Sequence, residues 1–273
     1  MKHDFSVLLS VYYRETPAYL DEALNSIERQ TVMPGEVVLV KDGPLSQELD
    51  EIIERHRGER RVEYTVVALE KNMGLGEALN EGVKYCRNEW IARMDSDDIA
   101  LPDRFEREFL YLARHRTLDV LGGWICEFDE DPNLCRKVRR VPADHDAIVR
   151  FARYRNPMNH MTVLFRKASV ESVGGYAPLR GFEDYYLWMR MLQQGKRFAN
   201  VSGIVLKART GKEMIRRRQG WKYAWGEMAL EKAAYRTGFW SKRDLARNFF
   251  VRFLPRLLPL FIVETLYNLL RKI

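Results

Sequence analysis

The sequence lacks several features that would by themselves assign a protein class. It has only three cysteines, Cys86, Cys126 and Cys135, without CxxC spacing, which argues against a zinc site and a thioredoxin-like redox motif. We expect all three to be reduced thiols, although Cys126 and Cys135 could also meet across a hairpin. The mean hydropathy of −0.39 excludes a polytopic membrane protein. Residues 249–263 are mostly apolar, but charge and proline interrupt them, so they do not predict a spanning helix.

Two sequence motifs are also missing. Residues 1–4 lead directly into an apolar stretch, so we expect no secretory leader. No GxGxxG pattern follows that stretch, which excludes a classical dinucleotide fingerprint. The 273 residues, 46% of them hydrophobic, suffice for one large domain or for one domain with an appendage.

Negative charge is scarce at the C-terminal end. The net charge is +7, yet residues 207–273 hold 16 Lys or Arg against 5 Asp or Glu, which leaves −4 for the first 206. A basic, aromatic, amphipathic segment of this kind favours a membrane surface, and we expect no nucleic-acid partner. The alternative is an ordinary helical extension that packs on the domain or on a second subunit.

The first hundred residues alternate between apolar runs and helical periodicity. Strands are expected at 5–10, 36–41 and 62–69 and in the run that ends near residue 93, with helices that begin at Pro17, Ser46 and Gly74 between them. This order predicts an α/β fold with a parallel sheet.

The pattern is less regular after residue 100. We expect a helix from Pro102 to about His115, strands at 120–128 and 135–141, and a helix that opens at 181–190. The predicted organisation is a domain over 1–210, with a nucleotide-binding half (1–100) and an acceptor half (101–210), and a helical extension over 211–273.

Three carboxylates lie within four positions, at Asp95, Asp97 and Asp98. Acids this close repel one another unless a counter-charge is present, and a divalent cation with oxygen ligands supplies one. The carboxyl ends of parallel strands form the ligand-binding rim of an open sheet, and Asp42 falls on the same rim. The alternative is a solvated turn in which Asp98 caps the next helix.

Four segments in this order resemble the inverting glycosyltransferases of family 2 with the GT-A fold, especially bacterial enzymes of O-antigen, capsule and exopolysaccharide synthesis. They are SVLLSVYY (6–13), VLVKDG (38–43), ARMDSDD (92–98) and GFEDY (181–185). The resemblance implies a Rossmann-like, mostly parallel central sheet flanked by helices. It also implies a nucleotide-sugar donor, a lipid-linked saccharide acceptor, and Mn²⁺ or Mg²⁺ as cofactor, at the cytoplasmic face of a membrane.

The resemblance also implies roles for single residues on the donor side. Asp97 and Asp95 would hold the metal ion on the diphosphate. The other positions that would contact the nucleotide-sugar are Ser10, Tyr12, Asp42, Asn72, Gly74, Asp95 and Ser96. The sequence departs from many relatives in having Leu79 where they have an arginine, which leaves the identity of the nucleotide open.

On the acceptor side, Asp184 would be the base that deprotonates the acceptor hydroxyl, with Glu183 beside it. His160 and Trp188 would face the acceptor, although each could equally be a structural residue. The predicted function is therefore a metal-dependent inverting glycosyltransferase that uses a donor linked to UDP. The alternative is a protein of the same fold that binds sugar nucleotides without turnover.

Overall fold

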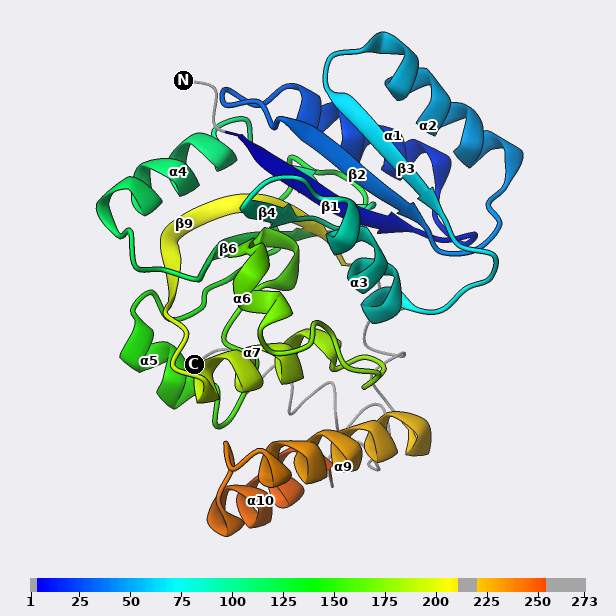
Figure 1. The fold of residues 1–273 in the computed structure, drawn as a ribbon. Helices are drawn as coiled ribbons and strands as arrows, with labels where there is room; N and C mark the ends of the chain where they lie inside the picture. The colour runs from blue at the N-terminus through cyan, green and yellow to red at the C-terminus, as the bar shows by residue number, and fades with distance from the viewer. Residues whose placement is uncertain (1–3, 211–219, 254–273) are drawn as a thin grey trace.

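The computed structural model describes residues 4–210 and 220–253, and it confirms the α/β class (Figure 1). Within these residues nine strands form one sheet, in the order β3-β2-β1-β4-β8-β6-β9-β5, and β7 pairs with β6 outside this path. Helices cover both faces of the sheet.

The N-terminal half is built as the alternation predicts. Its strands are β1 (Phe5–Val11), β2 (Glu36–Lys41), β3 (Glu63–Ala68) and β4 (Trp90–Arg93), and they pair in parallel. Between them lie α1 (Pro17–Glu28), α2 (Gln47–Glu59) and α3 (Leu75–Tyr85). The Ser46 hydroxyl accepts from the Leu49 backbone N–H and caps α2. The carboxyl ends of β1, β2 and β4 therefore lie along one edge.

Side chains of the buried strands alternate between two apolar cores, since successive residues of a strand point to opposite faces. In β1, Leu8 packs with α3 on one side, whereas Val7 and Leu9 pack with α1 on the other. Each such side chain, when fully buried, contributes about 1.5–3 kcal/mol. Strands buried on both faces explain why these segments are apolar throughout.

The C-terminal half extends the same sheet with mixed pairing. Strand β8 (Leu164–Arg166) runs antiparallel to β4 and β6 (Val120–Phe128), while β6 pairs in parallel with the long β9 (Phe198–Arg209). The two-residue β5 (Ile99–Ala100) pairs antiparallel with β9. This pairing fixes the end of β9 beside the segment that follows β4.

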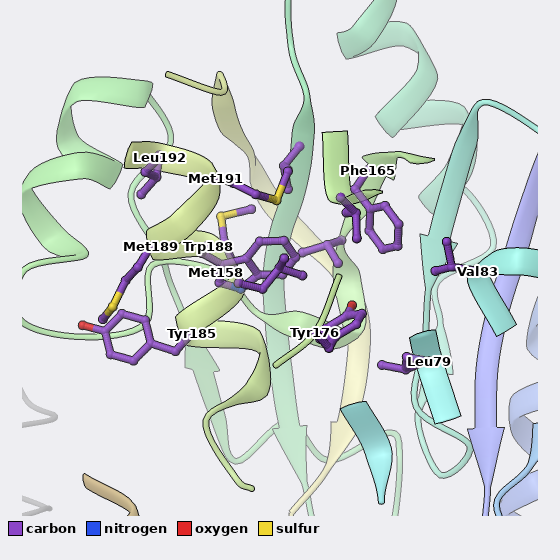
Figure 2. Packing of buried hydrophobic residues seen from close by; sticks show 14 of the residues in the cluster. Leu79, Val83, Met158, Phe165, Tyr176, Tyr185, Trp188, Met189, Met191 and Leu192 are labelled. Carbon is purple, nitrogen blue, oxygen red and sulfur yellow. The ribbon is translucent and has the colours of Figure 1, made fainter. Parts of the chain in front are cut away.

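Helices of this half lie around the extended sheet. They are α4 (Arg104–Arg114), α5 (His145–Phe151), the 3₁₀ turn η1 (His160–Thr162), α6 (Lys167–Glu171) and α7 (Glu183–Gln193). Trp188 of α7 is fully buried in the first core, and Figure 2 shows it among the labelled side chains of α3, α7 and β8.

The expectation that all cysteines are reduced is wrong for two of them. Strand β7 (Lys137–Arg139) folds back antiparallel on β6. This hairpin brings the Cα atoms of Cys126 and Cys135 to 5.6 Å, and the two sulfurs form a disulfide bond. Cys86 is a buried free thiol. The hairpin register, which sequence spacing does not reveal, decides the pairing.

The described part of the C-terminal extension consists of α9 (Trp221–Arg236), α10 (Lys242–Asn248) and the π-helical turn η2 (Phe249–Phe253). Leu230, Ala234 and Trp240 belong to the same core as α7, and Figure 1 shows α9 below that helix. No helix in residues 4–210 and 220–253 has the length and apolar character needed to cross a membrane. Of the predicted apolar stretch 249–263, only the first five residues lie within the described part.

Candidate active site

The three acids that follow β4 form one cluster. Carboxylate oxygens of Asp95, Asp97 and Asp98 lie within 4.8 Å of one another. Asp98 is almost fully buried and the other two are half-buried. The cluster stands at the carboxyl end of β4, on the rim that the strand order predicts.

Asp98 does not cap the following helix, so that alternative is wrong. The N-cap of α4 is Asp103, whereas one oxygen of Asp98 accepts from the backbone N–H of Arg209 at 2.9 Å. Its other oxygen, Oδ2, is buried and has no hydrogen-bond partner among the described residues. A buried carboxylate oxygen without a partner is costly, and a bound cation would satisfy it.

The electrostatics of the cluster support the same conclusion. Burial, followed by repulsion from Asp95 and Glu15, raises the pKa of Asp97 to about 7. Burial and the neighbouring acids also raise the pKa of Asp98 well above its ordinary value. Three oxygen donors of this kind match the ligand preference of Mg²⁺ or Mn²⁺, and the residues therefore fit the expected cofactor.

Arg93, the last residue of β4, is a buried cation beside the cluster. Its side chain is 2% exposed, and its guanidinium donates a hydrogen bond to the Asp95 carboxylate. Its Nε and Nη1 atoms have no partner among the described residues. The charge of Asp95 helps to raise the pKa of this guanidinium against the effect of burial. Arg93 thus places a buried positive charge among the acids of the rim.

The end of β1 leads to the acid cluster through a turn. Ser10 and Tyr12 are half-buried there, and the Tyr12 carbonyl accepts from the Glu15 N–H at 3.0 Å. Glu15 in turn accepts a hydrogen bond from the Ser96 hydroxyl. This contact holds the loop between Asp95 and Asp97 against the first strand.

Asp42, at the end of β2, organises the loop before α3. Its carboxylate accepts from the backbone N–H groups of Met73 and Gly74, at 2.6 and 3.0 Å, and from the Asn72 amide at 3.0 Å. The loop packs so closely that a Cβ on Gly43 would lie 2.7 Å from the Asn72 nitrogen, and Gly43 has φ +90°. Only glycine satisfies both conditions. Asp42, Asn72 and Gly74 therefore form one unit.

Glu183 and Asp184 occupy the first turn of α7. The Asn156 amide donates to Asp184 Oδ2 at 2.5 Å, and the Tyr185 backbone N–H donates to Oδ1 at 2.7 Å. Burial raises the pKa of Asp184, which the Asn156 and Tyr185 hydrogen bonds and the positive charge of Arg93 partly oppose. Burial also raises the pKa of Glu183. A carboxylate with a raised pKa is suited to accept a proton near neutral pH.

Tyr176 lies between the donor and acceptor sides. Burial raises the pKa of its phenol; the positive charge of Arg93 opposes this shift, and the carboxylates of Asp184, Asp95 and Glu183 add to it. Its hydroxyl and His160 Nε2 are in hydrogen-bonding contact at 2.9 Å. Burial, assisted by Arg93, lowers the pKa of His160 well below its ordinary value, which keeps the imidazole neutral.

Helix α3 joins the two sides of the site. The Cγ of Glu183 packs so closely on Gly76 that an added Cβ there would lie 3.0 Å from it. Asn80 of α3 holds the Tyr176 backbone with two hydrogen bonds, of 2.7 and 2.8 Å. The loop that Asp42 fixes is thus the start of the helix that supports the acceptor side.

The structure brings most of the predicted residues to one rim. The charge of Arg93, which pairs with Asp95, also acts on Asp184, so the acid cluster and the start of α7 lie near each other. The loop at Asp42 follows β2, which is separated from β4 by β1. Trp188 is different: it is fully buried and packs edge-on to the His160 ring, with 6.0 Å between ring centroids. Its indole therefore lies behind the rim, as the structural alternative for this residue states.

Sequence patterns missed several residues of the site. They are Glu15, Arg93, Asp98 in the cluster, Asn156, Tyr176 and Arg209. Arg209 stacks on the Tyr19 ring at 3.7 Å and donates to the Asp97 carbonyl at 3.3 Å. Arg93 and Asp98 lie within the segment ARMDSDD, and Asn156 begins the segment 156–160. No local pattern indicates Glu15 or Arg209.

Known proteins resemble this chain over most of its length. The family described as "Glycosyl transferase family 2" matches residues 6–172. The amylovoran biosynthesis glycosyltransferase AmsE of Erwinia amylovora is 40% identical over 271 residues, 98% of this chain and 99% of its own length. An Escherichia coli UDP-Gal:alpha-D-GlcNAc-diphosphoundecaprenol beta-1,3-galactosyltransferase is 36% identical over 255 residues, 93% of this chain and 92% of its own.

A solved structure shows the same fold. The mannosyltransferase PcManGT from Pyrobaculum calidifontis, in complex with GDP-Man and Mn²⁺, has a TM-score of 0.63 and 18% identity, and the match covers 100% of this chain and 81% of that one.

Proposed function

We propose that this chain, a glycosyltransferase that belongs to glycosyl transferase family 2, moves a sugar from a UDP-linked donor to a hydroxyl of a lipid-linked saccharide. The reaction would be a single displacement with inversion, and it would serve the synthesis of a surface polysaccharide at the cytoplasmic face of a membrane. The observation that carries the proposal is the arrangement of two kinds of carboxylate on one rim: the crowded triplet after β4 and the buried Asp184 at the start of α7.

On the donor side, Asp95, Asp97 and Asp98 would hold Mg²⁺ or Mn²⁺. When bound, the ion would neutralise the negative charge that grows on the nucleoside diphosphate as it leaves. Arg93 keeps Asp95 in place through its guanidinium. Ser96 and Glu15 keep the loop against the first strand.

The nucleoside would lie along the ends of β1 and β2. Asp42, with the loop at Asn72 and Gly74, would recognise the base, since its Oδ1 accepts only the Met73 N–H and keeps one further lone pair. Ser10 and Tyr12 would flank the base and ribose. The UDP assignment is supported by the name of the E. coli relative, which includes UDP-Gal.

On the acceptor side, Asp184 would take the proton of the attacking hydroxyl. Asn156 and the Tyr185 N–H orient its carboxylate, and burial tunes its pKa upward. Glu183, packed on Gly76, would contact the transferred sugar. Neutral His160 would support the acceptor pocket through Tyr176. A lipid-linked diphosphate acceptor is the class that the relative's name gives.

The test combines binding and transfer. Calorimetric titration with UDP and GDP, in Mn²⁺ or in chelator, should give metal-dependent binding of UDP that Asp97→Ala abolishes. Initial rates with UDP-sugars and a diphosphate-linked acceptor should fall about 10²–10⁴-fold in Asp184→Asn, the usual contribution of a general base, with UDP binding unchanged. Glu54→Gln, an exposed acid of α2, is the matched control and should behave as wild type. Transfer by Asp184→Asn at the wild-type rate would refute the assignment of the base.

A further inference from the structure

Helix α9 presents an exposed aromatic side. Trp221 and Trp225, one turn apart, are 65% and 63% exposed. Further along the same side, at helical spacing, follow the exposed Ala229, Lys232 and Arg236. Two neighbouring tryptophans that are mostly exposed are unusual on a protein surface that contacts only water. Tryptophan favours the membrane–water interface.

The charges of this region are separated by sign. Residues 220–253 contain three acids, Glu227, Glu231 and Asp244, and all three are buried. Glu227 pairs with Arg252, while Asp244 caps α10 and pairs with Arg153 and Arg247. The charged side chains that this segment exposes are all basic: Lys232, Arg236, Lys242 and Arg243. The described surface of α9 and α10 is thus aromatic and positive.

This chemistry favours one occupant, an anionic lipid surface. Tryptophan rings insert at the depth of lipid headgroups, and each Lys or Arg near such a surface adds attraction. A second copy of the chain is a poorer partner, because a symmetric contact would place equal positive charges against each other. The turn η2 adds two apolar side chains, Phe250 and Val251, which are 65% and 57% exposed.

The side of α9 opposite to the two tryptophans packs on the turn that precedes Asp184. The Tyr223 ring packs on Phe182, with 4.9 Å between centroids, and Gly226 is so close to Phe182 that an added Cβ would lie 2.9 Å from its ring. Phe182 is the N-cap of α7 and precedes Glu183 and Asp184 directly. The N-terminal half of α9, which carries both tryptophans, is therefore fixed to the turn that positions the base.

We propose that the side of α9 formed by Trp221, Trp225, Lys232 and Arg236 docks in the headgroup region of an anionic membrane, which sets Asp184 at the surface where a diphosphate-linked lipid acceptor is anchored. The inference deepens the proposed function and rests on its lipid-linked acceptor. It assigns the membrane contact to a defined, folded helix face.

The binding test uses the full chain and sedimentation with vesicles. Wild type should bind vesicles that contain 30% phosphatidylglycerol at least tenfold more tightly than pure phosphatidylcholine, with affinity that falls as salt rises. The double variant Trp221→Ala/Trp225→Ala should lose at least tenfold, and Lys232→Glu/Arg236→Glu should lose the preference for anionic lipid. Tyr85→Ala, which removes an exposed aromatic side chain on α3, should bind as wild type. Because the substituted side chains are exposed, circular dichroism and thermal unfolding should match wild type.

The activity test separates this inference from the proposed function. With the acceptor embedded in vesicles, the double tryptophan variant should lose at least tenfold in rate, whereas with a short-chain, water-soluble diphosphate acceptor it should stay within twofold of wild type. Failure of wild type with both acceptors would refute the proposed function. Unchanged vesicle binding by the double variant would overturn the docking face. A wild-type dimer that the double variant dissociates, seen by light scattering, would assign the face to a second copy instead.

Discussion

Replacing Asp97 with asparagine should stabilise the metal-free protein, although the same change should abolish its metal-dependent activity. In the folded chain the pKa of Asp97 is about 7, against an ordinary 3.8, because burial and two neighbouring acids oppose its ionisation. Between these two pKa values the unfolded chain releases the proton and the folded chain keeps it. The free energy of unfolding therefore falls as pH rises from about 4 to 7, and the penalty is complete above pH 7.

The magnitude follows from the two pKa values. At pH 8 the ionised Asp97 opposes folding by up to about 4 kcal/mol, and at pH 5 by about 1–2 kcal/mol. Asp97→Asn removes this charge and keeps the shape of the side chain. In chelator the variant should thus be more stable than wild type, by about 2–3 kcal/mol more at pH 8 than at pH 5.

Urea unfolding of both proteins at the two pH values measures this difference. Comparison with the variant at each pH removes the contributions of other titrating groups, such as the neutral His160. Glu54→Gln on the surface of α2 should show no such pH-dependent difference. Mn²⁺ at pH 8 should raise the stability of wild type by mass action and leave Asp97→Asn unchanged. If the free energies of unfolding of Asp97→Asn and wild type differed by the same amount at both pH values, the inference that ionised Asp97 destabilises the metal-free protein would be refuted.

Three further substitutions test the packing and the electrostatics of the chain. Gly82→Ala on α3 should lower the free energy of unfolding, measured by urea titration, by about 1 kcal/mol. The added Cβ would lie 2.4 Å from Leu8 Cδ1. The cost of this overpacking, about 1–3 kcal/mol, exceeds the gain in helix propensity of about 1 kcal/mol. Gly58→Ala on α2, with nothing within 4 Å of the added Cβ, should instead be stabilising; equal signs for the two would contradict the packing argument. Arg93→Met should lower the free energy of unfolding by about 3 kcal/mol. It should also move the acidic limb of the pH profile of kcat/KM to higher pH, because the guanidinium lowers the pKa of Asp184. An acidic limb at the wild-type pH would refute the influence of Arg93 on the pKa of the base.

The structure explains the departure at Leu79. This side chain is fully buried and belongs to the core between α3 and α7, and Figure 2 shows it beside Tyr176. A side chain in this core offers no polar contact to a nucleotide. The next residue, Asn80, holds the Tyr176 backbone instead. We therefore expect recognition of the nucleotide to depend on the Asp42 loop, which local hydrogen bonds fix.

The sequence by itself determined the alternating strands and helices of the first hundred residues, the rim at the strand ends, and the two acidic motifs to which we assign the chemistry. It could do so because apolar periodicity and short-range turn signals are local properties of the chain. Only the tertiary structure decided the pairing of Cys126 with Cys135, the burial of Arg93 among the acids, and the contact of Arg209 with Asp98. Each of these joins segments whose register depends on how the sheet continues after β4, where β8 inserts antiparallel between β4 and β6. Local residue patterns do not encode that long-range pairing, because it depends on how all the surrounding elements pack together.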